Sequence, residues 1–152
     1  MARSVRRKRN KYNARKVEFK GIVFDSQAEL EYYLLLKSDK NVQDIELQPQ
    51  YEIIKPYKVK CGRCDGRGKV LNTKTLNLNK CTLCKGYGTR TKAGAKYTAD
   101  FKVTYIDGEV KIIDVKGGPT SKDFTLRRKL FEIKTGEELV IAKKTGKGWE
   151  VK

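Results

Sequence analysis

The sequence predicts an α/β fold, and three observations indicate it. Apolar residues follow helical spacing over residues 26–37 and 121–134, and between and after these segments they recur at every second position, as in strands. Two alternating segments meet at Asp107 and Gly108, a typical turn pair. Residues 58–95 are rich in glycine and contain all four cysteines but show almost no apolar periodicity. We therefore expect one α/β domain with an insertion.

The first half should contain a hairpin, a helix and a strand. Residues 17–24 are expected to form a short strand or hairpin that turns at Lys20 and Gly21. A capping box starts the helix over 26–37. One broad face of this helix is apolar: Leu30, Tyr33, Leu34 and Leu36. Residues 45–54 alternate as a strand, in which Pro49 indicates an edge or a bulge.

The second half adds four strands and a helix. Strands are expected over 97–106 and 109–116, then a helix over 121–134, then strands over 138–143 and 148–151. The predicted order is therefore helix, three strands, helix, strands.

The charge of the chain indicates a polyanionic partner. The sequence has 35 Lys and Arg against 18 Asp and Glu, a net charge of +17, and such a surplus favours nucleic acid through contacts with phosphates. Histidine is absent. This excludes Ser-His-Asp and Cys-His catalysis, zinc held by histidine, and an imidazole base.

Eight basic residues and no acid lie within residues 1–16. We predict a flexible arm there that binds phosphates, with a solvated tail or a targeting signal as alternatives. Its central basic residues are Arg6, Arg7, Lys8 and Arg9.

No secretory or membrane-spanning segment is recognisable in the sequence, so we expect a cytoplasmic protein without a membrane partner. In a reducing compartment, cysteines bind metal more often than they form disulfides.

The cysteines form two matching pairs in the pattern C-x2-C-x16-C-x2-C, each pair extended to C-x-x-C-x-G-x-G: Cys61, Cys64, Cys81 and Cys84. Four thiolates on two tight turns can complete a tetrahedral shell around one Zn²⁺, and a closed shell makes this zinc structural. Two disulfides or four free thiols are the alternatives.

The repeated pattern resembles the cysteine-rich zinc repeats of DnaJ-type chaperones, although only two repeats occur and nothing else in the chain matches. Several lysines and arginines surround these cysteines. We therefore favour a finger that faces nucleic acid over a chaperone surface.

A few acids lie in otherwise apolar strands. Residues 97, 99, 101, 103 and 105 are all apolar, so Asp100 points to the opposite face of its strand. Asp114 and Lys116 share a face of the next strand, and Glu29 in the first helix can add a third carboxylate. Such a set suits a divalent cation with a lysine beside it. Glu29 could instead serve only the capping box, and Asp114 and Lys116 could form an ion pair on a solvated face.

In combination these residues resemble the PD-(D/E)XK nuclease superfamily, and in particular a group of small phage-encoded proteins similar to Holliday-junction resolvases. The matching motifs are Gly-Ile-Val-Phe-Asp-Ser-Gln-Ala-Glu at 21–29, Leu-Gln-Pro at 47–49, Tyr-Thr-Ala-Asp-Phe at 97–101 and Asp-Val-Lys-Gly at 114–117. Ala99 stands where the superfamily name has proline. The resemblance covers residues 10–57 and 96–142.

The resemblance implies a restriction-endonuclease-like core over 17–57 and 96–152, in the order helix, three-stranded antiparallel meander, helix, strand. It also implies that Asp100, Asp114 and the Val115 carbonyl hold Mg²⁺ or Mn²⁺, with Glu29 nearby directly or through water. Lys116 would orient or help to deprotonate the attacking water. Gln48 would bind that water or the DNA, unless it is simply a polar strand residue. The helix over 121–134 would present Arg127, Arg128 and Lys129 to the DNA backbone, unless these only form its solvated face.

The expected function is that of a metal-dependent DNA endonuclease acting on branched or Holliday-junction DNA, encoded by a phage and active in the host cytoplasm. Symmetric cleavage of a junction needs two sites, so a homodimer is expected. The alternative is a non-catalytic zinc-containing protein that binds nucleic acid.

The register of the predicted hairpin tests this site. A two-residue turn at Asp107 and Gly108 would pair residues whose numbers sum to 215, and Asp100 and Asp114 would then lie on opposite faces. A shared metal requires an even sum, such as 214. We therefore predict a three-residue loop or a bulge, with Gly108 in the left-handed region.

Overall fold

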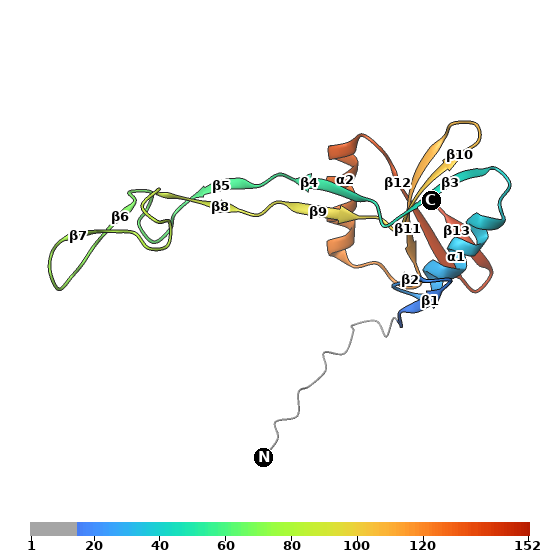
Figure 1. The fold of residues 1–152 in the computed structure, drawn as a ribbon, viewed down its shortest axis with the longest axis horizontal. Coiled ribbons are helices and arrows are strands. Elements are labelled where there is room, and N and C mark those ends of the chain that lie inside the picture. Colours follow the sequence, from blue (N-terminus) through green and yellow to red (C-terminus); the bar gives the residue numbers. More distant parts are fainter. Residues whose placement is uncertain (1–14) are drawn as a thin grey trace, which may run out of the picture. The chain divides into compact units, whose positions relative to one another are not determined.

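A computed structural model describes residues 15–152, which form a mixed α/β structure with two helices and many strands (Figure 1). The chain divides into two compact units. The core unit comprises residues up to Gln50 and Thr98–Lys152, and the cysteine unit comprises Tyr51–Tyr97. The predicted insertion, 58–95, is therefore too short. The reason is that β4 (Gln50–Ile54) pairs with β9 (Ala95–Thr98), which continues the two-stranded region beyond the predicted limits.

The core unit is built on a five-stranded sheet with the strand order β13-β12-β11-β10-β3. Three of its strands form an antiparallel meander: β3 (Val42–Leu47), β10 (Phe101–Tyr105) and β11 (Val110–Lys116). Next to β11 lies β12 (Leu139–Thr145), which runs parallel to it and pairs with the antiparallel β13 (Gly148–Val151). The order of helix, three strands, helix and strands is as predicted.

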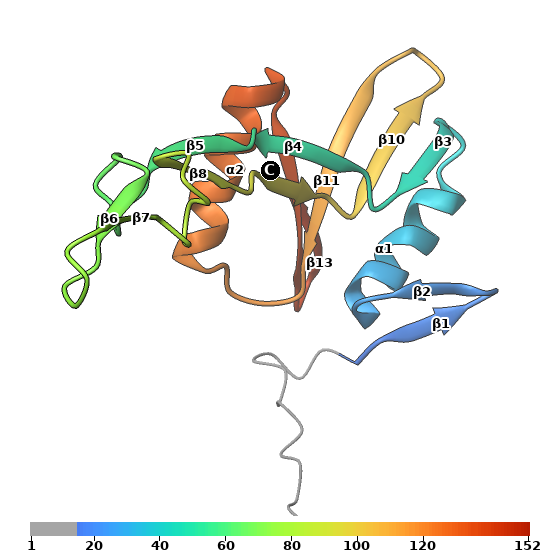
Figure 2. The same cartoon turned by 60° about the vertical axis from the view of Figure 1, so that its left-hand side comes forward.

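Two helices lie on opposite faces of this sheet (Figure 2). One is α1 (Gln27–Ser38), whose N-cap Ser26 accepts a hydrogen bond from the Glu29 N–H as the capping box predicts. The other is α2 (Lys122–Thr135), which connects the parallel strands β11 and β12. It begins at the N-cap Ser121 and ends at Gly136, whose φ is 72°.

The buried face of α1 differs from the prediction at one position. Leu34 is exposed, whereas Tyr32 is buried. The Tyr32 ring packs against Trp149 of β13 with the ring centroids 4.8 Å apart, and against Phe101 at 6.2 Å. The main core cluster lies between this helix and the sheet: Phe24, Leu30, Tyr32, Tyr33, Leu36, Phe101, Val103, Ile113, Val115 and Ala142.

The two longest predicted strands are both interrupted. The segment over 45–54 breaks at Gln48, whose φ is 49°, and the following Pro49, so that it forms the separate strands β3 and β4. The segment over 97–106 breaks before Phe101 into β9 and β10. Before α1, β1 (Val17–Phe19) and β2 (Ile22–Phe24) form the expected hairpin, with positive φ at both turn residues.

The register between β10 and β11 confirms the predicted even sum. Phe101 pairs with Ile113, and the pairing continues with the sum 214 to Thr104 and Val110. Three residues form the loop, because the Tyr105 N–H donates to the Glu109 carbonyl over 2.8 Å. Gly108 has a φ of 87°, in the left-handed region as predicted. Continued by one residue, this register would pair Asp100 with Asp114, but Asp100 precedes β10 and the regular ladder ends at Phe101.

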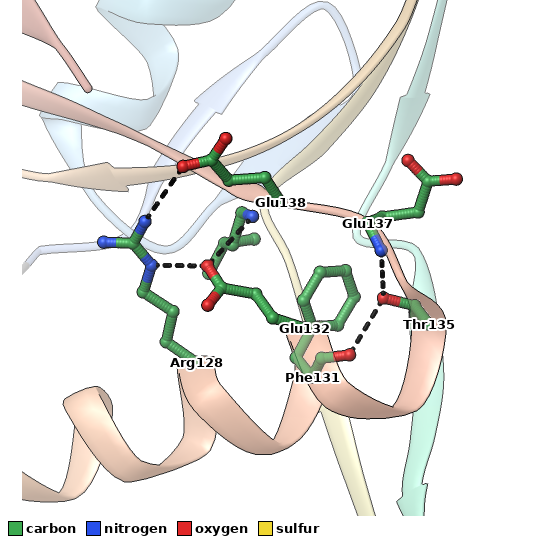
Figure 3. A network of polar contacts seen from close by, with 7 residues as sticks. Arg128, Phe131, Glu132, Thr135, Glu137 and Glu138 are labelled. Atoms are coloured by element: carbon green, nitrogen blue, oxygen red, sulfur yellow. Dashed lines mark hydrogen bonds and ion pairs between the residues drawn. The ribbon is translucent and has the colours of Figure 1, made fainter.

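A polar network joins the end of α2 to the start of β12 (Figure 3). Glu132 Oε1 accepts a 2.8 Å hydrogen bond from Arg128 Nε and a 3.3 Å bond from the Leu139 N–H. Arg128 Nη2 also lies 3.8 Å from Glu138 Oε1. Because Arg128 is paired with two carboxylates, its position favours a structural role over the predicted contact with phosphate.

The cysteine unit consists of short two-stranded ladders. β5 (Tyr57–Lys60) pairs with β8 (Thr89–Lys92), and β6 (Lys69–Leu71) pairs with β7 (Leu78–Lys80). Within residues 15–152, neither helix is long and apolar enough to cross a lipid bilayer.

Candidate active site and metal centre

Asp100 lies at the start of β10, where it is tied to β11 through backbone groups. The Asp100 N–H donates to the Ile113 carbonyl over 3.1 Å, one residue out of the register of the hairpin, so Asp100 and Phe101 both lie opposite Ile113. Its carboxylate oxygen Oδ2 accepts a 2.6 Å hydrogen bond from the Val115 N–H. The side chain is thereby held beside the segment that carries Asp114 and Lys116.

Asp114 is the one charged side chain in the buried class among the described residues, with only 4% of its surface exposed. Its oxygen Oδ2 forms an ion pair with Lys116 Nζ. The ammonium group of Lys116 also lies 4.3 Å from the centroid of the Phe124 ring, close enough for a cation–π interaction. The predicted ion pair is therefore present, but on a largely buried carboxylate rather than on a solvated face.

Glu29 caps α1 and also affects this site. Ser26 Oγ donates to its Oε1 over 2.8 Å, and the Asp25 N–H donates to its Oε2 over 3.1 Å. Burial raises the pKa of Glu29 above its ordinary value, these hydrogen bonds oppose the rise, and the charges of Asp25 and Asp114 add to it. The capping role and a place near the acids are therefore compatible.

The environment of Asp100 strongly disfavours its ionised form. Burial, then the negative charge of Asp114, and to a lesser extent that of Glu29, raise the pKa of Asp100 to about 7. The hydrogen bond from Val115 and the charge of Lys116 only partly offset this rise. Negative charge is therefore concentrated here beyond what the neighbouring lysine neutralises.

One cavity is lined by two of these acids, and a second is lined by the neighbouring Val115 and Lys116. The smaller, of about 150 Å³, is lined by Glu29, Gln48 and Asp100 together with apolar residues. The Gln48 N–H donates to the Asp100 carbonyl over 2.9 Å, so the break after β3 brings this glutamine beside the acid.

The larger cavity has a volume of about 870 Å³ and carries positive charge. Arg15, Lys116 and Arg127 line it, together with the N-cap residues Ser26 and Ser121. Helix N-termini offer unpaired N–H groups to anions, so two such termini and three cations, against the one lining acid Asp123, suit a phosphate.

The remaining residues predicted to bind DNA are more scattered. Lys129 is exposed on α2 but does not line the larger cavity. Arg127 lines that cavity and lies 4.0 Å from Asp123 on the same helix. The predicted contacts at Arg6, Arg7, Lys8 and Arg9 lie outside the described residues.

The four cysteines come together as predicted, all buried and with their sulfur atoms within 4.8 Å of one another. Cys61 Sγ lies 3.9 Å from Cys81 Sγ, and Cys64 Sγ lies 3.6 Å from Cys84 Sγ. These distances are too long for disulfides, but they match the separation of about 3.8 Å expected around a tetrahedral zinc with bonds of about 2.3 Å. The cluster can therefore hold a structural metal such as zinc.

The cysteines form the only group of three or more ligating side chains gathered this closely within residues 15–152. The oxygens of Glu29, Asp100 and Asp114 are thus not all within 4.8 Å of one another.

The backbone of the cysteine cluster has approximate twofold repetition. We call residues 60–68 the first knuckle and residues 80–88 the second knuckle. The Cys61 N–H donates to the Gly88 carbonyl and the Cys81 N–H to the Gly68 carbonyl, both over 2.8 Å. The Gly68 and Gly88 N–H groups each donate to a cysteine sulfur over 3.3 Å, the contacts that stabilise metal-bound thiolates.

Replacement of Gly88 by alanine should weaken metal binding by 30-fold or more. A Cβ atom there would lie 2.2 Å from the Gly66 carbonyl oxygen, and φ is 72°. Strain of this kind costs roughly 2–4 kcal/mol. G62A is the matched control, because nothing lies within 4 Å of a Cβ at Gly62. Competition for zinc with a chelator measures both variants, and equal affinities would contradict the expectation.

The comparisons with known proteins identify one family. The family described as "Protein of unknown function (DUF1064)" matches residues 9–147. The chain belongs to this DUF1064 family. No curated protein and no solved structure matches the chain. The match with DUF1064 spans the four cysteines as well as the acids around Asp100.

Some features of this DUF1064 site were not predicted from the sequence. Phe124 contacts Lys116, and Arg15 and the two N-cap serines line the larger cavity. A capping serine before each helix is visible in the sequence, but nothing local indicates that both helices begin at the same cavity.

Proposed function

We propose that this DUF1064 protein is a metal-dependent endodeoxyribonuclease of the PD-(D/E)XK type, with branched DNA as its substrate. The observation that carries the proposal is the hydrogen bond from the Val115 N–H to Asp100 Oδ2, which holds Asp100 beside the strand segment that contains Asp114 and Lys116. Lys116 is on the same strand as Asp114 and is paired with it. This is the set of groups that the sequence motifs predict for phosphodiester hydrolysis.

The acids fit a hard divalent cation. Burial and then the negative charge of Asp114 raise the pKa of Asp100, and a bound cation would favour its ionised form against both. Asp100, Asp114 and the Val115 carbonyl would hold Mg²⁺ or Mn²⁺, with Glu29 nearby directly or through water. A cation there would supply electrostatic stabilisation of the phosphorane-like transition state and lower the pKa of a bound water.

The chain's own residues would perform the remaining tasks. The Lys116 ammonium, fixed between Asp114 and the Phe124 ring, would hold the attacking water by donating a hydrogen bond to it. The cavity lined by Arg15 and Arg127 would bind the DNA backbone, because its cations and helix N-termini favour phosphate.

Branched DNA as substrate, and a homodimer as the active form, follow from the resemblance to junction resolvases rather than from the site itself. Two symmetric cuts require two copies of the site, which a twofold dimer would provide. By the same resemblance we propose that the enzyme is phage-encoded and acts in the cytoplasm of the host cell.

Incubation with linear, nicked and four-way-junction DNA tests this function. With Mg²⁺ or Mn²⁺ the wild-type protein should cleave the junction, and D114N should be at least about 1000-fold slower because it removes a buried carboxylate that would bind the cation. D114N should bind the junction within about threefold of wild type, because no phosphate contact is removed.

D44N is the matched control, since Asp44 is an exposed acid on β3 of the same sheet. It should cleave like wild type. Tight binding by the wild-type protein without cleavage of any substrate would refute the nuclease. That result would favour the alternative, a non-catalytic zinc-containing protein that binds nucleic acid.

A further inference from the structure

The two knuckles have matching backbones but different surfaces. Both have a lysine immediately before the first cysteine, Lys60 or Lys80. In both, the aliphatic part of this lysine side chain packs against a glycine. A Cβ at Gly66 would lie 3.2 Å from Lys60 Cε, and a Cβ at Gly86 would lie 2.8 Å from Lys80 Cε. The two lysines are therefore held in equivalent places.

The first knuckle pairs its lysine internally. Lys60 Nζ lies 2.5 Å from Asp65 Oδ1. The hydrogen bond and charge of Lys60 lower the pKa of Asp65, so the pair stays ionised at neutral pH. Arg67, between the two glycines of this knuckle, donates from Nε to the Cys64 carbonyl over 3.3 Å. Arg63 Nη1 donates to Thr82 Oγ1 of the second knuckle over 2.8 Å, so each cation of the first knuckle has a polar partner within the cysteine unit.

The second knuckle has the opposite character. Lys85 occupies the position equivalent to Asp65, so two lysines stand where the first knuckle has an ion pair. Within residues 15–152, neither Lys80 nor Lys85 has an ion-pair partner within 4.0 Å. Tyr87 occupies the position of Arg67 and is 80% exposed. Uncompensated cations beside an exposed aromatic ring therefore distinguish this knuckle.

The surrounding charge indicates the class of partner. The cysteine unit, residues 51–97, contains 12 Lys and Arg but only 2 Asp and Glu, a net charge of +10 before any metal binds. Four thiolates and one Zn²⁺ would lower this charge by only two. A surface of this kind attracts a polyanion, and lysines next to an exposed aromatic ring suit a nucleic-acid strand with bases available for stacking.

We propose that the second knuckle is a nucleic-acid-binding site specific for unpaired nucleotides, in which Lys80 and Lys85 contact phosphates and Tyr87 stacks on a base. This proposal rests on the proposed function only because both take nucleic acid as the partner. Binding at the second knuckle does not require that the protein cleaves DNA. The first knuckle, with its internal ion pair, serves mainly to complete the metal site. The cysteine unit thereby adds recognition of single-stranded segments to the protein.

Binding of the zinc-loaded full chain to a fluorescent single-stranded oligonucleotide tests the site, measured by anisotropy without Mg²⁺ and without chelator. K85D allows the introduced carboxylate to pair with Lys80 as Asp65 pairs with Lys60. It should weaken binding about tenfold or more and lower the salt slope, log Kd against log salt, by about 1.4, since two phosphate contacts are lost. Y87A should weaken binding about 5- to 50-fold, whereas Y87F should bind like wild type, because stacking needs the ring but not the hydroxyl.

K55D is the matched control, because it changes the charge of the cysteine unit by the same amount as K85D. Lys55 lies beyond the end of the β5–β8 ladder that is farther from the cysteines. K55D should reduce affinity less than twofold and leave the salt slope unchanged. Equal effects of K85D and K55D, or wild-type binding by Y87A, would overturn the proposal, as would equally tight binding of a blunt duplex. Zinc content near one per chain in every variant confirms that the knuckles are intact.

The outcomes separate this proposal from the proposed function. Binding that depends on Tyr87, without any cleavage in Mg²⁺, would refute only the nuclease. Cleavage that proceeds while K85D and Y87A bind like wild type would refute only the second-knuckle site.

Discussion

Removal of metal from the four cysteines should unfold the cysteine unit while the core unit stays folded. Within residues 15–152, one further apolar side chain packs against the cysteine cluster, the half-buried Val70. Zinc coordination supplies on the order of 10–16 kcal/mol in small zinc-dependent folds, far more than such a cluster can provide. The core unit instead has its own cluster of aromatic and aliphatic residues between α1 and the sheet.

Hydrogen exchange followed by mass spectrometry, with and without a zinc chelator, measures this effect. Backbone amides of β5 to β8 should lose protection after chelation, and the amides of β10 and β11 should keep theirs. C64S should show the same loss without chelator. G62A, which changes a residue between two cysteines where an added Cβ meets nothing within 4 Å, should bind one zinc and remain protected. A cysteine unit that stays protected with zero metal would contradict the structural role.

Burial also raises the pKa of the Cys64 thiol, to about 11. Because zinc binds the thiolate, metal binding must displace this proton at neutral pH. The same chelator competition should therefore show weaker zinc binding as the pH falls.

D100N should abolish cleavage and yet stabilise the metal-free protein at pH 8. Asparagine keeps an oxygen that can accept the hydrogen bond from Val115, but it removes a carboxylate from a buried, negatively charged site. Cleavage should fall at least about 1000-fold because the proposed cation loses a ligand. At pH 8 the melting temperature should rise by roughly 3–6 °C, which corresponds to about 1–2 kcal/mol in a protein of this size.

The gain in stability should depend on pH in a defined direction. Below the ordinary pKa of 3.8 the carboxyl of Asp100 is protonated in the folded and the unfolded chain, so it imposes no electrostatic penalty. As the pH rises from there to about 7, the unfolded chain ionises while the folded chain keeps its proton, and the wild type progressively loses stability. The difference between D100N and wild type should therefore be near zero at pH 3.5 and largest above pH 7.

Thermal melts across this pH range, with D44N as control, measure the difference. D44N should melt like wild type at each pH. Added Mg²⁺ should raise the melting temperature of wild type but not of D100N. A D100N protein that is less stable than wild type at pH 8 would show that the charge of Asp100 is compensated in the folded state without a cation.

Several features could be predicted from the sequence because they depend on residues close together in the chain. Alternation through residues 97–105 and 110–116, together with a glycine suited to positive φ at position 108, led to the even register that the structure confirms. Ser26 and Glu29 lie three residues apart and form the expected capping contacts. Each pair of cysteines likewise lies within one tight turn, so their gathering follows from spacing and glycine positions.

Other features depend on segments that are distant in the chain. Tyr32 replaces Leu34 on the buried face of α1 because Trp149, more than a hundred residues later, packs against it. Arg128 pairs with Glu138 after the helix ends, although the helical pattern alone presents it as a surface cation. The strand breaks at Gln48, whose backbone is left-handed, and this break brings Gln48 beside Asp100. A left-handed backbone at a residue other than glycine cannot be predicted from the local sequence.

The sequence by itself thus determined the fold class, the register of the central hairpin, the cysteine cluster and the identity of the acids. Only the tertiary structure decided that Asp114 is buried, that Asp100 retains its proton up to about pH 7, and that two helix N-termini meet at one cavity. The physical reason is that turns, caps and strand alternation arise from contacts within a few residues. Burial and the repulsion between carboxylates instead depend on through-space distances that exist only once α1, β10 and β11 have packed together.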